Sequence, residues 1–377
     1  MKRLIGYALT QPLFVVLGTL LFILAGVTAF RNLSVEAFPD VTDTQVTIIA
    51  LYPGRAAEEV EKQVTLPIEV AVSGLPNALR VFSHTQFGLS YTVITYDDEA
   101  EVMTARQQVN ERLRGVDLPP GVEANIAPNS TPVGEVMRYR LRGDGYSATD
   151  VRTVEDWVVE WTLRQVPGVA DVVAMGGAIK QYEVQPDLDK LRAYKLTFQN
   201  LLDALGRGNS NAGGSYVAQG AQQYAIRGIG LLASADDIGR IVLTSRGGTP
   251  ILIRDVAQVK VGAVPRLGVV GQDADDDIVT GIVVMRKGEN PSEVLKGIKQ
   301  KITALNEKGL PPGMKIEPYY DRTWLMGKTL STVFRNLVEG AVLVSIVLYL
   351  FLSNIRASLA VVVIIPLALL STFLGLK

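Results

Sequence analysis

The sequence contains no cysteine and a single histidine, His84. The absence of cysteine excludes a disulfide framework and thiolate metal sites, and one imidazole without partners does not make a metal centre. We therefore assign His84 to an ordinary strand position. The net charge of −1 gives no basic face of the kind that nucleic-acid binding requires, so no nucleic-acid partner is expected.

The sequence also lacks the combinations of residues that catalysis requires. A Ser/His/Asp set is impossible beyond His84, and the Gly- and Asn-rich segment 206–214 has the spacing of neither the phosphate-binding P-loop nor the dinucleotide fingerprint. The seven methionines never pair at helical spacing, so they form no local thioether site for Cu(I) or Ag(I). The sequence predicts that the protein is not an enzyme and has no resident cofactor.

Long apolar runs dominate what is present. Residues 12–30 carry no charged side chain, which is enough for an α-helix to cross a bilayer. Lys2 and Arg3 precede this run, and the positive-inside rule then places the N-terminus in the cytoplasm. Residues 1–32 are predicted to be a cytoplasmic start and a first transmembrane helix, followed by an external, periplasmic domain.

Two more apolar runs lie near the C-terminus, joined by a short connector that contains Arg356. A basic residue in so short a loop marks the cytoplasmic face. We predict a second transmembrane helix at 333–352 and a third at 357–377. A third helix with so uniform an apolar surface would normally pack against further spans, so we expect the chain to be a truncated part of a longer protein.

The external region contains a duplicated unit. Leu-Pro-Pro-Gly occurs at 118–121 and again at 310–313, each time between a predicted helix and a short strand. In the first unit, residues 33–133, strands near 46–52, 79–86 and 89–97 alternate with two helices, and Pro67 predicts a kink in the first of them. The order β-α-β-β-α-β is that of the ferredoxin-like fold.

The second unit follows the same order but is interrupted. It comprises residues 134–177 and 268–328. Its first strand is predicted from the alternation of Met137, Tyr139 and Leu141 with arginines, and its second helix is predicted to begin with Asn290 as its cap and Pro291 at its first position. Its first helix has an apolar face predicted at Val151, Val154, Val158 and Trp161. Residues 178–267 form a separate small α/β lobe. The fold class is therefore α+β, with transmembrane helices and two ferredoxin-like βαββαβ units.

Three groups of residues are candidates for function. Asp275, Asp276 and Asp277 form an acidic run that attracts hard cations, although a solvated loop is the alternative. Glu339 is the acid inside an apolar run and is either an intramembrane functional group or an interfacial carboxylate. A hairpin arm is predicted at the Gly- and Asn-rich segment, with the contact residues Asn209, Asn211, Gly213 and Gly214.

The chain resembles the N-terminal part of heavy-metal efflux pumps of the resistance-nodulation-division superfamily, the CusA/CzcA type. The stretches that carry the resemblance are FPDVTDTQVTI (38–48), PGRAAEEVEKQVTLPIEVAVSGLP (53–76), FGLSYTVITYDDEAEVMTARQQVNERL (87–113), DDDIVTGIVVMRKGENPSEVLKGI (275–298) and YDRTWL (320–325). The second and fourth stretches are typical of the metal-transporting branch rather than of the multidrug branch.

This resemblance implies a secondary active transporter of the bacterial inner membrane. It would be a proton/metal cation antiporter that works as a homotrimer by alternating access, with a periplasmic adaptor protein and an outer-membrane channel as partners. The two units would be porter subdomains, and residues 178–267 a docking lobe whose arm reaches the neighbouring protomer. The family's proton-relay acids and main metal-binding positions would lie beyond residue 377.

The transported ion is less well specified. Copper and silver pumps of the family carry methionine before an Arg-x-Gly, where this chain has Pro265-Arg266-Leu267-Gly268. This difference favours divalent Zn, Co, Cd or Ni over Cu or Ag. A multidrug pump of the same superfamily is the first alternative, although aromatic residues total only 7%. A membrane-anchored periplasmic ligand sensor is the alternative from a different class.

Overall fold

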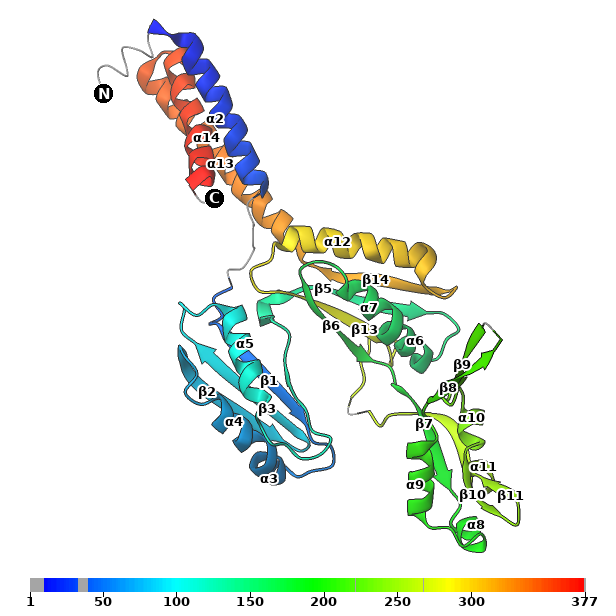
Figure 1. Ribbon diagram of the computed structural model, residues 1–377. Coiled ribbons are helices and arrows are strands. Elements are labelled where there is room, and N and C mark those ends of the chain that lie inside the picture. The colour runs from blue at the N-terminus through cyan, green and yellow to red at the C-terminus, as the bar shows by residue number, and fades with distance from the viewer. Residues whose placement is uncertain (1–9, 33–39, 221, 267, 376–377) are drawn as a thin grey trace.

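The computed structural model describes residues 10–32, 40–220, 222–266 and 268–375. Two sheet-and-helix units lie beside each other, a smaller lobe extends from one of them, and long helices gather at the opposite end (Figure 1). The predicted cytoplasmic residues Lys2 and Arg3 fall outside the described residues.

The first unit contains a four-stranded antiparallel sheet in the order β2-β3-β1-β4. Its elements are β1 (Gln45–Leu51), α3 (Ala57–Val60), α4 (Leu66–Val72), β2 (Ala78–Gln86), β3 (Leu89–Tyr96), α5 (Val102–Leu113) and β4 (Ala124–Ile126). A π-helical segment at Glu61–Thr65 joins α3 to α4, and Pro67, the second residue of α4, has no N–H to donate to the preceding turn. His84 lies in β2, as predicted.

The second unit repeats this path with the order β14-β5-β13-β6, again antiparallel throughout. Its elements are β5 (Glu135–Gly143), α6 (Ala148–Val154), α7 (Glu160–Arg164), β6 (Val169–Gly176), β13 (Val279–Met285), α12 (Pro291–Ala304) and β14 (Met314–Asp321). The Leu-Pro-Pro-Gly turns have the same cause in both units, because Gly121 and Gly313 have φ angles of 83° and 86°, which favour glycine.

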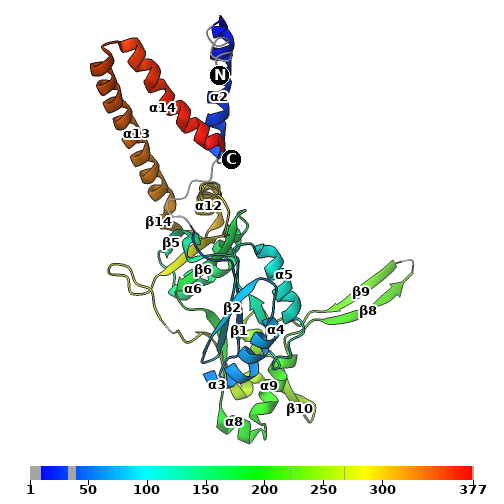
Figure 2. The same cartoon turned by 90° about the vertical axis from the view of Figure 1, so that its left-hand side faces the viewer.

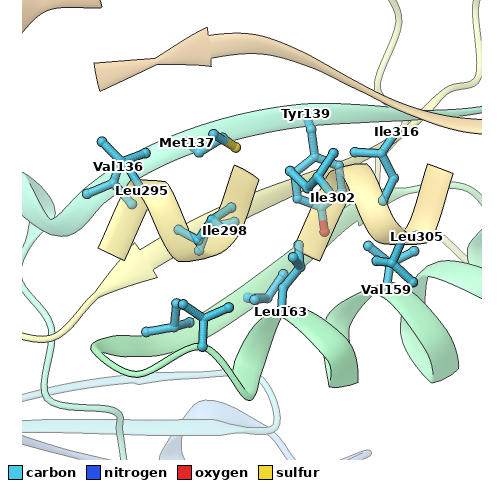
Figure 3. Packing of buried hydrophobic residues seen from close by; sticks show 14 of the residues in the cluster. Val136, Met137, Tyr139, Val159, Leu163, Leu295, Ile298, Ile302, Leu305 and Ile316 are labelled. Atoms are coloured by element: carbon cyan, nitrogen blue, oxygen red, sulfur yellow. The ribbon is translucent and has the colours of Figure 1, made fainter. Parts of the chain in front are cut away.

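The core of the second unit lies between its sheet and its helices (Figure 3). The predicted alternation of β5 is confirmed, since Met137, Tyr139 and Leu141 are buried. The predicted face of the following helix is wrong at Trp161, whose side chain is 56% exposed. A π-helical segment at Glu155–Val159 shifts the helical register, so Val159 and Leu163 point into the core instead.

An inserted lobe separates β6 from β13. It contains β7 (Lys180–Pro186), α8 (Leu188–Ala193), α9 (Phe198–Arg207), β8 (Ala212–Gln219), β9 (Gln222–Gly228), α10 (Ala235–Gly239), β10 (Val242–Arg246), β11 (Thr249–Leu252), α11 (Ile253–Val256) and β12 (Ala257–Ala263). Strands β7 and β12 pair with each other, and Leu201, Ile253 and Ala257 form one of the lobe's small cores.

Three apolar helices pack at the far end of the molecule: α2 (Pro12–Asn32), α13 (Arg322–Leu352) and α14 (Ile355–Gly375). The ring of Phe30 lies 5.9 Å from that of Phe334 and 4.9 Å from that of Phe373, which links all three helices. By length and composition, Leu13–Phe30 and Arg322–Phe351 are two candidate membrane spans in the described chain, and Val362–Gly375 is a shorter apolar helix. Helix α13 begins well before the predicted residue 333, at the end of β14.

Candidate functional site

The first unit, the second unit and α13 meet at a junction, which we define by Asp40, Thr42, Thr131, Val133, Arg286, Lys287 and Arg322. Thr131 Oγ1 donates a hydrogen bond of 2.7 Å to Asp40 Oδ2. Lys287 Nζ donates one of 2.5 Å to the Thr42 carbonyl, and Arg322 Nη1 donates to the Val133 carbonyl. These bonds tie three separate parts of the fold together.

The charged side chains of Asp40 and Arg322 at the junction are half-buried and buried, respectively. Burial acts to raise the pKa of Asp40, but hydrogen bonds from Thr131 and Thr42 and the charge of Lys287 hold that pKa below its usual value. Asp40 is therefore ionised at neutral pH. Arg322 is only 2% exposed, and it is the first residue of α13, so this buried cation links the junction directly to the long apolar helix.

The acidic run lies on the loop between the inserted lobe and β13. Asp275 pairs with Arg140 of β5, and Asp277 Oδ2 lies 2.7 Å from Arg266 Nη1. All three aspartates are exposed; Asp275 and Asp277 line one hollow of about 270 Å³, and Asp276 is outside its lining. Within the described ranges, no group of three or more His, Asp or Glu side chains is arranged to hold a metal ion. Metal contact by this run stays a prediction.

That prediction requires cations to compete with arginine for the same carboxylates. We expect Asp275→Asn with Asp277→Asn to weaken zinc binding to the full-length protein by about tenfold, since two negative ligands are lost. Arg140→Gln should strengthen binding by a similar factor, because it frees the Asp275 carboxylate. Calorimetric titration with zinc measures both effects, and Asp189→Asn is the matched control, because it lies in an exposed Asp–Arg ion pair outside this hollow. Equal zinc affinity in all variants would contradict metal contact.

Glu339 lies on α13, where its Oε1 atom is 3.8 Å from Arg335 Nε and its side chain is 69% exposed. The structure therefore assigns Glu339 a basic neighbour one helical turn away, and a functional role for it stays a prediction.

The predicted arm is longer than the segment that suggested it. Strands β8 and β9 form a hairpin that projects from the inserted lobe (Figure 2). Asn209 and Asn211 lie at its base, where their side chains accept hydrogen bonds from the backbone N–H groups of Leu232 and Gly230. Gly213 and Gly214 lie on β8, and every residue of β8 is exposed. A protomer contact by these four residues stays a prediction.

Glu155 was missed by the sequence analysis. It is completely buried beneath the second sheet, and Tyr139 Oη donates a hydrogen bond of 2.5 Å to its Oε1 atom. Its other oxygen, Oε2, has no hydrogen-bond partner among the described residues. Burial raises the pKa of Glu155 to about 7. The steps of four from Val151 to Glu155 to Val159 were a signal in the sequence that this glutamate faces the core.

Residues 4–377 match the AcrB/AcrD/AcrF family. The cobalt-zinc-cadmium resistance protein CzcA of Cupriavidus metallidurans is 39% identical over 386 residues, which cover 100% of this chain and 36% of the relative. The cation efflux system protein CusA of Escherichia coli is 34% identical, and the match covers 98% of this chain and 36% of CusA.

A solved structure agrees with these relatives. The crystal structure of a heavy metal efflux pump, crystal form II, superposes with a TM-score of 0.92 at 36% identity, covering 99% of this chain and 38% of that protein. The chain therefore spans little more than a third of the length of the proteins it matches.

Proposed function

Since this chain belongs to the AcrB/AcrD/AcrF family, and within it to the heavy-metal efflux pumps of the resistance-nodulation-division superfamily, we propose that it is the N-terminal part of a proton-driven metal cation exporter. The pump would be a secondary active transporter, a proton/metal cation antiporter of the bacterial inner membrane. The chain covers 36% of its curated relatives, so the activity belongs to a longer protein.

The two units are proposed to be ferredoxin-like porter subdomains, at 33–133 and at 134–177 with 268–328. Their shared strand order supports this assignment, because each unit is one β-α-β-β-α-β path with its first and third strands central. Residues 178–267 would be the docking lobe. Its exposed hairpin suits contact with a neighbouring protomer of a homotrimer, and an adaptor protein and an outer-membrane channel would complete the assembly.

The membrane placement follows from the three apolar helices. We propose that α2, α13 and α14 cross the inner membrane, with both units in the periplasm. Their apolar side chains are largely exposed, which fits contact with lipid.

The observation that carries the proposal is the continuity of α13. This helix starts at Arg322 inside the junction and runs unbroken through the apolar segment to Leu352. A displacement of α13 in the membrane would therefore move residues that contact both units. Such a connection allows proton flow within the bilayer to change the shape of the external part.

The cargo is proposed to be a metal cation. Relatives are named for resistance to cobalt, zinc and cadmium and to nickel and cobalt, and the identity to CzcA, 39%, exceeds that to CusA, 34%. The higher identity to CzcA agrees with the missing methionine before Arg266 in favouring Zn, Co or Cd over Cu or Ag. The nickel and cobalt resistance protein CnrA, at 34%, is no more similar to this chain than CusA is, so nickel is favoured by the missing methionine alone. Leu267 of that motif lies outside the described residues.

Zinc flux in proteoliposomes tests the proposal. The full-length protein is expected to move zinc only when a pH gradient is imposed, and residues 1–377 alone should move none, because the proton-relay residues are expected beyond them. Zinc uptake is followed with an entrapped fluorescent indicator. Flux from the fragment alone, or flux by the full-length protein that ignores the pH gradient, would contradict the proposal. Saturable ligand binding without any flux would instead favour a sensor.

A further inference from the structure

The junction encloses a cavity of about 230 Å³ at the meeting point of the two units and α13. Its lining consists of Asp40, Thr131, Val133, Gly134, Met285, Arg286, Lys287, Gly288 and Arg322. Three of these side chains are cationic and one is a carboxylate. The cavity therefore has an excess of positive charge.

Arg322 is the decisive residue. It is 2% exposed, and one of its terminal nitrogens, Nη1, donates to the Val133 carbonyl. The other, Nη2, is fully buried and has no hydrogen-bond partner in the part of the chain that the structure describes. A buried guanidinium N–H without an acceptor is costly, so this atom calls for an acceptor from outside the described chain.

The carboxylate in the cavity does not supply that acceptor. Asp40 Oδ1 accepts the Thr42 N–H at 3.1 Å, and Oδ2 accepts the Thr131 hydroxyl at 2.7 Å. Asp40 and Arg322 thus line the same cavity without forming an ion pair. Lys287 directs its ammonium group to the carbonyls of Thr42 and Asp43, and no carboxylate of the described residues lies at hydrogen-bonding distance from it.

We propose that this cavity is a binding site for a phosphate-type oxyanion. The guanidinium of Arg322 would donate to it through Nη2 in a charge-assisted hydrogen bond, while Nη1 keeps its bond to the Val133 carbonyl. Lys287 and Arg286 add positive charge, and Arg286 is exposed and marks the open side of the cavity. The anion links the linker before β5, the end of β13 and the start of α13, and so stabilises the junction.

The bound oxyanion has two candidate sources. One is free inorganic phosphate, and the other is the phosphate of a lipid headgroup, since α13 continues into an apolar segment. The test uses the full-length protein purified in detergent and radiolabelled inorganic phosphate in equilibrium dialysis, at constant ionic strength set with sodium chloride. Saturable binding that sulfate displaces and chloride does not is expected. Stronger displacement by dihexanoylphosphatidylglycerol than by phosphate assigns the site to headgroups, and weaker displacement assigns it to the free ion.

Arg322→Gln should lower the affinity for phosphate at least tenfold. The matched control is Arg335→Gln, which removes an exposed arginine from the same helix and should leave affinity unchanged. If Arg322→Gln fails to fold, the exposed Arg286→Gln variant carries the test, with an expected loss of about threefold. Absence of saturable phosphate binding overturns the proposal, and so does wild-type affinity in both junction variants. Neither result depends on whether the protein exports metal.

Discussion

Glu155→Gln is expected to stabilise the second unit above pH 7 by roughly 3 kcal/mol and to remove most of the pH dependence of its stability between about pH 4.5 and 7. Glutamine is neutral at every pH and keeps a carbonyl oxygen that accepts the Tyr139 hydroxyl. The variant therefore preserves the hydrogen bond and the volume of the core while it removes the ionisable group. Its amide NH2 takes the place of Oε2, which has no partner among the described residues, so about 3 kcal/mol is the upper bound of the gain.

The direction of the pH effect on stability follows from which state, folded or unfolded, keeps the proton on Glu155. Burial raises the pKa of Glu155 from 4.5 to about 7, and the neighbouring Asp156 and Glu160 add to this increase, while Tyr139 and Arg152 oppose it. Between these two values the folded state keeps a proton that the unfolded state has lost. The free energy of unfolding of the wild type therefore falls as pH rises, by about 1.4 kcal/mol per pH unit, and the penalty is complete above about pH 7.

Thermal unfolding of the full-length protein measures this effect through tryptophan fluorescence, because Trp157 lies on the same helical segment as Glu155. The midpoint of Glu155→Gln should exceed that of the wild type by about 5 °C or more at pH 8 and by much less at pH 5. Glu307→Gln changes an exposed glutamate of the same unit and should change neither midpoint. Parallel pH profiles for Glu155→Gln and the wild type would show that another group titrates.

Gly281→Ala is expected to destabilise the second unit by about 3 kcal/mol and to reduce the amount of folded protein in the membrane. A Cβ atom at Gly281 of β13 would lie 2.1 Å from Tyr139 Cζ and 2.2 Å from its hydroxyl oxygen. Because Tyr139 is fully buried, its ring has no free space to move into. The substitution displaces the ring and breaks its bond to Glu155.

Gly206→Ala is the matched control, since a Cβ at this position in α9 meets no atom within 4 Å. It should leave stability unchanged or raise it by up to about 1 kcal/mol through helix propensity. Tyr139→Leu combined with Gly281→Ala should cost less than the two single changes together, because the smaller side chain removes the overlap. Wild-type stability of Gly281→Ala would contradict the close approach of the Tyr139 ring to the backbone of β13 at Gly281.

Much of the chain path was predictable because it depends on short patterns. The alternation around Tyr139 predicted β5, and Asn290 followed by Pro291 predicted the start of α12, where Asn290 does accept a hydrogen bond from the Ser292 N–H. The repeated Leu-Pro-Pro-Gly predicted the duplication. Such signals lie within a few residues of the atoms they position, so no knowledge of distant contacts is needed.

The errors occurred where the helical period changes. Trp161 was predicted to face the core on a period of 3.6 residues, but the π-helical segment at Glu155–Val159 lengthens one turn and rotates the later residues. Glu155 was missed for a different reason: it keeps the regular step of four from Val151, but an unpaired glutamate is not expected in a core. The composition of the segment does not show where a π-helical turn replaces an α-helical one, because such a turn is stabilised by tertiary packing rather than by residue preference.

By itself, the sequence determined the apolar helices, the duplicated strand-and-helix order and the membership of the metal-efflux branch. Each of these depends on local hydrophobic periodicity or on a contiguous sequence motif. Only the tertiary structure decided which charged groups are buried and what they contact. Asp275 finds Arg140 across 135 positions, and Arg322 reaches Val133 across 189. Charge state and pairing depend on the groups that folding brings near, and those neighbours are distant along the chain.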